Sequence, residues 1–167
     1  ESTIIDVTVN PPMILRPGFI TYEMVKEIVP DATEDRTIFT KPTKEFKPKA
    51  PGMKYRHYAP KADLIIVEGE PEEETKAIRQ LVYEQVRKWE KTGVIATTES
   101  AEAYHYGLVK VIGSRNNEKS IARNLYAVLR EFDEEEISLI YSESVAAEGI
   151  GSAIMNRLEK AAGHKRL

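Results

Sequence analysis

Short apolar runs alternate with amphipathic stretches throughout residues 62–167. The apolar runs fall at 64–67, 94–96, 108–112 and 137–141. Short runs of this kind, bounded by polar and turn residues, are typical of strands buried on both faces of a sheet. Parallel strands must be joined by long crossover segments, usually helices. The alternation therefore predicts a Rossmann-like α/β fold, in which a parallel sheet carries helices on both faces.

The helix expected after the first apolar run has recognisable ends. Pro71 suits the first turn, and the helix dipole favours the three glutamates that follow it. The apolar face of this helix is expected to continue to Trp89, with Gly93 as the stop. Two further helices are expected, one with apolar residues at 121, 125, 128, 129 and 132, and one near 152–162 that stops at Gly163.

Residues 1–29 contain too few elements to form a domain by themselves. A strand is expected over 2–8 and a second over 13–16, with the prolines after Asn10 forming the turn between them. Thr21 is a plausible N-cap for a short helix that follows. Two strands and one short helix do not bury enough apolar surface to be stable alone. We therefore expect them to be the last elements of an incomplete domain.

Residues 30–61 are expected to form a long, extended linker. Five of the nine prolines lie here, and each proline removes a backbone donor and biases the preceding residue toward extended geometry. Between Lys41 and Lys61 there are seven cations and one anion, although the whole chain has a net charge of −3. This charge suits an anionic ligand or docking onto an acidic surface. A solvated linker extended by its own charge is an equal alternative.

The composition excludes several kinds of site. Without cysteine, the chain has no disulfide framework and no thiolate chemistry. Its three histidines, His57, His105 and His164, are far apart in the sequence, so we expect no metal site. No run of 18 apolar residues and no signal segment is present, which predicts a cytoplasmic protein without membrane contact.

Two glycine-containing turns suggest ligand sites only weakly. Gly149 and Gly151 open the last helix, as in a dinucleotide-binding loop, but Ile154 stands where that loop needs a third small residue. Gly151 is instead expected to allow close backbone packing. The turn 113–116 has donors that suit an anion, although an ordinary polar turn between strand and helix is the favoured interpretation.

Ser2, Thr3 and Arg16 suggest a binding edge on the first pair of strands. Hydroxyls that begin one strand and an arginine that ends the adjacent strand can line one edge of a sheet and hold a carboxylate or phosphate. Ordinary strand polarity explains the same pattern, and the spacing alone does not outweigh that alternative.

Three stretches together resemble the two-domain form of the threonylcarbamoyl-AMP synthase family. They are STIIDVT with ILRPG, the decapeptide PGMKYRHYAP at 51–60, and EGIGSAIMNRLEKAA near the C-terminal end. The resemblance implies a YrdC-like catalytic domain, a linker and a Rossmann-like second domain. In this sequence it implies a remnant of the catalytic domain over 1–29, the linker over 30–61 and the second domain over 62–167.

The resemblance also implies a reaction. The family is a nucleotidyltransferase that makes L-threonylcarbamoyladenylate from L-threonine, bicarbonate and ATP, with release of pyrophosphate. Its product supplies the threonylcarbamoyl group of a modified adenosine in transfer RNA, through a separate transfer machinery. ATP would be a substrate accompanied by Mg²⁺, with no metal site in this chain and no direct contact with nucleic acid.

Particular residues match the family's ligand contacts. Ser2 matches the serine that contacts threonine, and Arg16 matches the arginine that contacts ATP. Of the two linker tyrosines, Tyr58 is preferred to Tyr55 as the one that reaches the nucleotide. The family's Lys-x-Arg and Ser-x-Asn catalytic motifs precede the matched part, so no catalytic residue is expected in this chain, which alone is expected to be inactive.

The cationic decapeptide suits a gate over a nucleotide site. Lys54, Arg56 and His57 would neutralise phosphate charge, and its prolines would reduce the entropy lost on docking. A different class of function is a stand-alone, non-catalytic module that docks a partner of the transfer-RNA modification machinery. An independent nucleotide-binding domain is a weaker third alternative, because the glycine pattern is incomplete.

Overall fold

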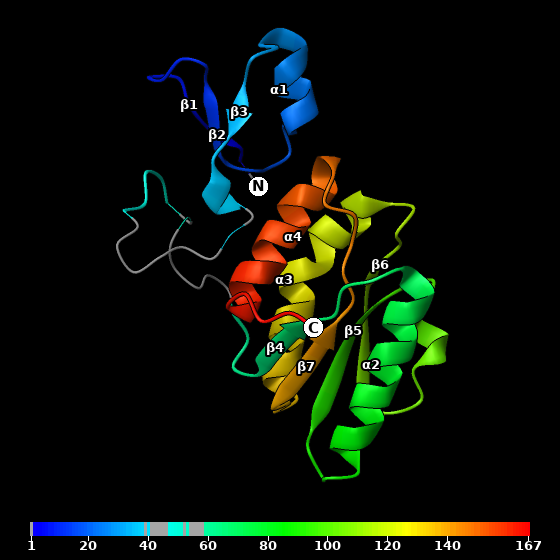
Figure 1. Cartoon of the computed structure of the whole chain (residues 1–167). Coiled ribbons are helices and arrows are strands. Elements are labelled where there is room, and N and C mark those ends of the chain that lie inside the picture. The colour runs from blue at the N-terminus through cyan, green and yellow to red at the C-terminus, as the bar shows by residue number, and fades with distance from the viewer. Residues whose placement is uncertain (1, 39, 41–46, 52, 54–58) are drawn as a thin grey trace.

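The computed structural model describes residues 2–38, 40, 47–51, 53 and 59–167. The described chain contains two separate sheets. One has three strands in the order β1-β2-β3, and the other has four strands in the order β4-β7-β5-β6. Figure 1 shows the small sheet with α1 at one end of the molecule and the larger sheet with α2, α3 and α4 at the other.

The first sheet is built from residues near the N-terminal end. Its elements are β1 (Ile4–Asp6), β2 (Met13–Arg16), α1 (Tyr22–Ile28), β3 (Thr33–Glu34) and the 3₁₀ turn η1 (Arg36–Ile38). β1 and β2 are antiparallel, whereas β3 runs parallel to β2. The hydroxyl of Thr21 accepts a hydrogen bond from the backbone N–H of Met24, which confirms Thr21 as the N-cap of α1.

Residues 33–38, predicted to belong to a linker without secondary structure, instead form a short strand and a 3₁₀ turn on the first sheet. Thr33 pairs with Met13 and Glu34 with Ile14, and η1 follows directly. The physical reason is burial, because Ile38 is only 2% exposed and packs in one cluster with Ile14. A two-residue strand is too short to show the alternation from which strands are predicted.

The second sheet confirms the predicted Rossmann-like α/β architecture. Its elements are β4 (Asp63–Ile66), α2 (Pro71–Val86), β5 (Thr92–Thr97), the 3₁₀ turn η2 (Ala101–Ala103), β6 (Leu108–Gly113), α3 (Glu118–Glu134), β7 (Leu139–Ser142) and α4 (Gly149–Ala162). All of its strand pairs are parallel. None of the helices in the described ranges is both long and apolar enough to cross a membrane.

Helices cover both faces of this sheet (Figure 1). α3 and α4 bury one face, where Leu125 and Phe132 pack with Ile140. α2 buries the opposite face, where Ile78 and Val82 pack against the strands. Each fully buried aliphatic side chain contributes about 1.5–3 kcal/mol, so these two clusters hold the layers together.

The predicted end of α2 is wrong. The helix ends at Val86 rather than near Gly93, and Trp89 is 94% exposed with a positive φ of 63°. Gly93 lies inside β5, where a Cβ atom would stand 2.5 Å from a ring carbon of Phe132. This glycine is therefore required for helix packing and does not terminate α2.

The expectations for Gly151 and Gly163 are confirmed. A Cβ atom at Gly151 would lie 1.9 Å from the carbonyl oxygen of Ala146, so the start of α4 packs directly on the preceding loop. Gly163 has φ 61° and ψ 32° and terminates α4 in the left-handed conformation.

The two sheets are joined by specific contacts as well as by the chain. Asn156 on α4 donates from Nδ2 to the carbonyl oxygen of Ile38 over 2.8 Å. The pKa of Glu23 on α1 is lowered by hydrogen bonds from its own backbone N–H, from the Thr21 hydroxyl and from the backbone N–H of Gly149. These contacts fix the start and middle of α4 against the first sheet.

Candidate functional site

Arg16 and Ser2 meet at the edge of the first sheet. The antiparallel pairing of β1 with β2 places Ile4 opposite Arg16, at the end of β2. From there the guanidinium donates to the backbone carbonyl oxygen of Ser2, from Nε over 3.2 Å and from Nη2 over 3.0 Å. The structure thus brings together the two residues predicted to contact ATP and threonine.

Other groups at this edge are bonded within the chain. The hydroxyl of Thr3 donates to the carbonyl oxygen of Ile20 over 2.7 Å. Ser2 is exposed and Arg16 half-buried. A guanidinium has five N–H donors, so the two bonds to Ser2 orient the side chain and leave capacity for a further acceptor.

The predicted linker contacts lie outside the described residues. These are Lys54, Tyr55, Arg56, His57 and Tyr58. On the N-terminal side of this group, Lys49 pairs with Asp35 over 3.4 Å, and Met53 is 2% exposed.

A cluster of buried charges occupies the C-terminal edge of the parallel sheet, where open α/β folds commonly bind ligands. Glu143 follows β7 and is 4% exposed. Its carboxylate accepts hydrogen bonds from the Thr97 backbone N–H at 3.1 Å, the Thr97 hydroxyl at 2.9 Å, the Tyr104 hydroxyl at 2.6 Å and Nη2 of Arg115 at 3.0 Å. The Ser100 hydroxyl is a further donor.

Glu74, in the first turn of α2, shares Arg115 with Glu143. One Glu74 oxygen accepts from the backbone N–H and hydroxyl of Ser144, at 2.5 and 2.6 Å, and the other accepts from Nη2 of Arg115 at 2.5 Å. Arg115 also donates to the Ser144 carbonyl oxygen over 2.9 Å. Burial raises the pKa of Glu74, in opposition to the hydrogen bonds from Ser144 and the charge of Arg115.

The carboxylate cluster, defined as Glu74, Arg115 and Glu143, fills this edge with the chain's own groups. Burial and the neighbouring Glu143 raise the pKa of Tyr104, so its hydroxyl remains a donor. The hydrogen bonds of the cluster run between groups of the chain itself, so the cluster joins α2, β5, β6 and β7.

Sequence reasoning missed this cluster because its glutamates resemble solvated ones. Glu74 stands in a run of glutamates that was assigned to a helix start. The spacing of Glu74 with Ile78 and Val82, four residues apart along one helix face, was the one indication of burial.

The donors of the turn 113–116 bind a carboxylate of the chain itself, that of Glu99. Glu99 accepts from the Ser114 hydroxyl at 2.5 Å, the Arg115 backbone N–H at 3.1 Å and Nδ2 of Asn116 at 3.4 Å. The hydrogen bond from the Ser114 hydroxyl, and after it the one from the Arg115 backbone N–H, lower the pKa of Glu99 to about 2. The turn therefore has the anion-binding donors noted in the sequence, but it uses them to connect two loops.

The fold and these sites define a Rossmann-like α/β module that carries a small sheet with an Arg–Ser edge before it. The family model described as threonylcarbamoyl-AMP synthase, C-terminal domain, matches residues 20–163. The chain belongs to this family, as the resemblance predicted.

Curated relatives support the same family. The chain is 40% identical to the threonylcarbamoyl-AMP synthase of Bacillus subtilis over 98% of its length, which corresponds to 45% of that relative. It is 36% identical to the Pyrococcus abyssi synthase over 99% of its length and 46% of the relative. The chain thus spans about half the length of the relatives that it matches.

Solved structures share the fold. P. abyssi Sua5 complexed with L-threonine matches the whole chain with 36% identity and a TM-score of 0.90, over 47% of that protein. The C-terminal Sua5 domain of Pyrococcus horikoshii matches 65% of this chain and 98% of its own length, with 35% identity and a TM-score of 0.53.

We expect Arg115→Met to lower the free energy of unfolding by about 3–5 kcal/mol at pH 7. The change removes the cation from between two buried carboxylates and leaves them unpaired. Urea unfolding followed by circular dichroism measures the effect. Arg123→Met, at an exposed position on α3, is the matched control and is expected to change the free energy of unfolding by no more than about 0.5 kcal/mol.

The loss of unfolding free energy in Arg115→Met is expected to depend on pH. The folded-state pKa of Glu74 lies above its unfolded value, so protonation favours the folded state, and this contribution is lost as pH rises through the folded pKa. Without Arg115 that pKa rises further. The difference from wild type is therefore expected to be smaller at pH 5 than at pH 7, and an equal deficit would contradict a role of charge.

Proposed function

We propose that this chain is the C-terminal part of a threonylcarbamoyl-AMP synthase. The longer protein would make L-threonylcarbamoyladenylate from L-threonine, bicarbonate and ATP, and a separate machinery would transfer the product to transfer RNA. The observation that carries the proposal is the match to two curated synthases, at 36% and 40% identity, over nearly the whole chain.

Exposed apolar side chains support a longer protein. Within the first 28 residues, Val7 is 75% exposed, Phe19 59% and Ile28 85%. These side chains lie after β1, in the loop before α1 and at the end of α1. Exposed apolar side chains at such density are expected to be covered by a partner surface. We infer that the rest of the catalytic domain packs on them.

We propose three functional parts. Residues up to 38 would complete the catalytic domain, because β3 and η1 pack with β2. The linker would then run to residue 61, and 62–167 would form the second domain. The isolated P. horikoshii domain covers 65% of this chain, which is about the fraction that residues 62–167 represent.

Arg16 and Ser2 suit the two ligands of such a site. Arg16 would hold an ATP phosphate, since a guanidinium binds phosphate oxygens through paired N–H donors. Its bonds to the Ser2 carbonyl would then keep the proposed nucleotide contact next to the proposed threonine contact. Mg²⁺ would accompany ATP, with its ligands outside this chain.

The linker is proposed to act as a gate. Adenylation stabilises charge at phosphorus, protects a labile carbamate from water and then releases pyrophosphate. Lys54, Arg56 and His57 would supply positive charge when the linker closes, and Tyr58, or less favourably Tyr55, would contact the nucleotide. Opening of the same segment would release pyrophosphate.

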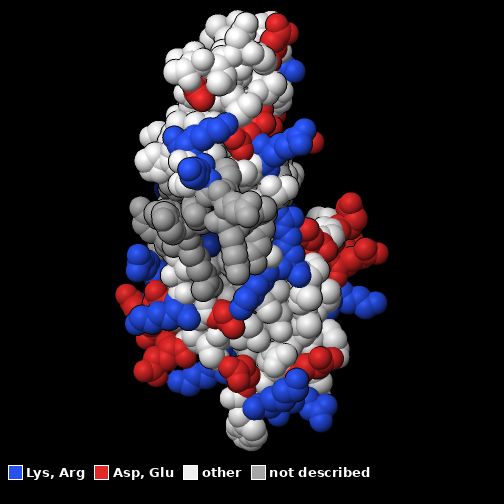
Figure 2. Space-filling model, turned by 60° about the vertical axis from the view of Figure 1, so that its left-hand side comes forward, with Lys and Arg blue, Asp and Glu red and all other residues white. Residues whose placement is uncertain are grey.

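Transfer RNA is not proposed as a direct ligand. On the described part of the face shown in Figure 2, Lys and Arg side chains are interspersed with Asp and Glu. Nucleic-acid binding generally needs a continuous basic patch or stripe. The described part of this face therefore does not by itself support direct binding of transfer RNA.

We expect the longer protein that contains this chain to release pyrophosphate when given ATP, L-threonine and bicarbonate. The 167-residue chain alone is expected to release none above background, since the Lys-x-Arg and Ser-x-Asn motifs of the family lie outside it. Omission of L-threonine is the control. Turnover by the chain alone would place the active site within it, and absence of turnover by the longer protein would favour a non-catalytic binding module.

In the longer protein, Arg16→Ala is expected to weaken ATP binding more than threonine binding, and Ser2→Ala the reverse. Loss of a charge-assisted hydrogen bond of about 1.5–3 kcal/mol corresponds to a roughly ten- to hundredfold weaker affinity for ATP. Titration calorimetry with each ligand measures both effects. Equal losses for the two ligands would show that the assigned roles are wrong.

The gate predicts protection by nucleotide. Trypsin cleavage after Lys54 and Arg56 in the longer protein is expected to slow when ATP is bound, and Tyr58→Ala is expected to remove that protection. Tyr58→Phe keeps the ring and is the matched control for loss of the hydroxyl alone. Cleavage at the same rate with and without ATP would mean that the linker is only a tether.

A further inference from the structure

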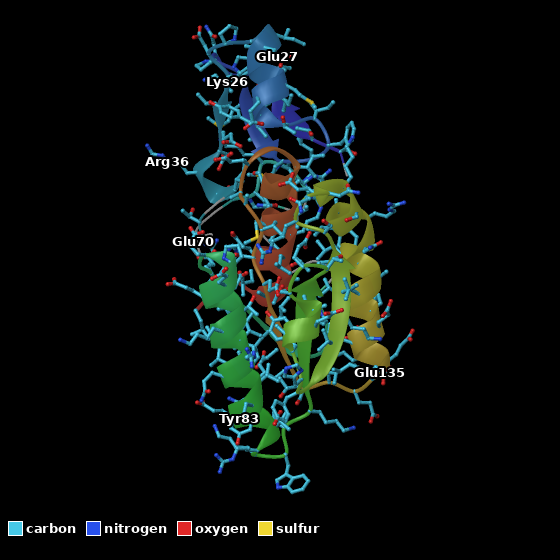
Figure 3. The ribbon with its side chains drawn as sticks, turned by 90° about the vertical axis from the view of Figure 1, so that its right-hand side faces the viewer. Lys26, Glu27, Arg36, Glu70, Tyr83 and Glu135 are labelled. Carbon is cyan, nitrogen blue, oxygen red and sulfur yellow. The ribbon has the colours of Figure 1, made fainter. Side chains whose placement is uncertain are left out.

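A pocket lies on the α2 face of the large sheet, away from Arg16. The connection from β5 to β6 spans residues 98–107 and contains only η2, instead of the helix that usually covers such a crossover. The space beside α2 is therefore not filled by a second helix. Figure 3 shows α2 from the side, with Glu70 before its first residue and Tyr83 near its other end.

The pocket has a volume of about 420 Å³, within the range of sites for small molecules. Two segments form its walls. The lining residues are Lys76, Arg79, Gln80, Val82 and Tyr83 from α2, and Tyr104, His105 and Tyr106 from the loop before β6. We refer to these eight residues as the tyrosine pocket.

The charge of the tyrosine pocket suits an anion. Lys76 and Arg79 are one helical turn apart and both exposed. Among the described residues, neither forms an ion pair, and no Asp or Glu lines the pocket. Elsewhere on α2 acidic residues are common, so the positive charge is local to this turn.

The aromatic side chains suit a flat ring. The rings of Tyr83 and Tyr106 have centroids 5.3 Å apart at an interplanar angle of 56°, and they are 39% and 51% exposed. Arg87 lies 5.7 Å from the Tyr83 ring. Exposed aromatic faces of this kind bind bases by stacking, with little dependence on sequence.

The floor of the pocket is held rigidly. Tyr104 is 7% exposed, and its hydroxyl donates to Glu143 of the carboxylate cluster over 2.6 Å. Val82 is also buried. The charged network at the sheet edge therefore sets the position of the aromatic floor, and a preformed pocket requires little ordering when a ligand binds.

We propose that the tyrosine pocket binds a nucleoside monophosphate. The base would stack on Tyr106 beside Tyr83, and the phosphate would contact Lys76 and Arg79. This combination favours a nucleotide over a bare phosphate, which would leave the rings unused, and over a nucleoside, which would leave the two cations unused. The site is separate from the proposed substrate site at Arg16.

Titration calorimetry of the 167-residue chain with AMP tests the proposal. AMP is expected to bind saturably, and more tightly than either adenosine or inorganic phosphate measured alone. Arg79→Ala is expected to weaken AMP binding by about ten- to hundredfold, and Tyr106→Ala by about tenfold. Both residues are exposed, so the variants are expected to fold, which circular dichroism checks.

Two controls separate this site from others. Arg130→Ala removes an exposed arginine on α3, on the opposite face of the sheet, and is expected to leave AMP binding unchanged. Arg16→Ala tests the alternative that AMP binds at the proposed substrate site, because binding there would depend on Arg16. No saturable binding at millimolar AMP would overturn the proposal, as would binding that is lost with Arg16→Ala but not with Arg79→Ala.

Discussion

The position of Arg115 between Glu74 and Glu143 holds the edge of the large sheet together. These residues come from the turn after β6, the first turn of α2 and the segment after β7. Buried charges are stable only when paired and hydrogen-bonded, and here Thr97, Ser100, Tyr104 and Ser144 supply the remaining donors. Because Tyr104 belongs to this network, the same interaction fixes the floor of the tyrosine pocket.

This network also places the chain's own carboxylates at the C-terminal edge of the parallel sheet. In many open α/β folds a ligand's charged group sits beyond the C-terminal ends of the strands. Here Glu143 and Glu99 take that place and use donors that resemble a ligand site in the sequence. The module is thereby closed where related architectures are open, and its accessible pocket lies beside α2.

The periodic parts of the fold were predictable from sequence, and the exceptions have physical causes. Strong alternation located the parallel strands and α3, and terminal residues such as Thr21, Pro71 and Gly163 placed helix ends correctly. β3 was not predicted, because a strand of two residues is too short to show an alternation of apolar and polar side chains. Gly93 was misassigned because a glycine needed by a ring from another element resembles a helix stop in the sequence. The adjacency of Ser2 and Arg16 followed from simple antiparallel pairing, whereas Glu74 required knowledge of which helix face is buried.

The last residues of the chain determine where another strand can join the large sheet. The backbone N–H of Ile66 donates to the Lys165 carbonyl and that of Leu167 donates to Ile66, so this tail lies along the outer side of β4. Arg166 reinforces it by pairing with Glu68. A partner that adds a strand to the sheet would meet this tail at the end of β4, whereas at β6 it would meet the Lys110–Glu131 ion pair. The β6 edge of the large sheet thus keeps its outer backbone groups available, whereas residues 165–167 already pair with the end of the β4 edge.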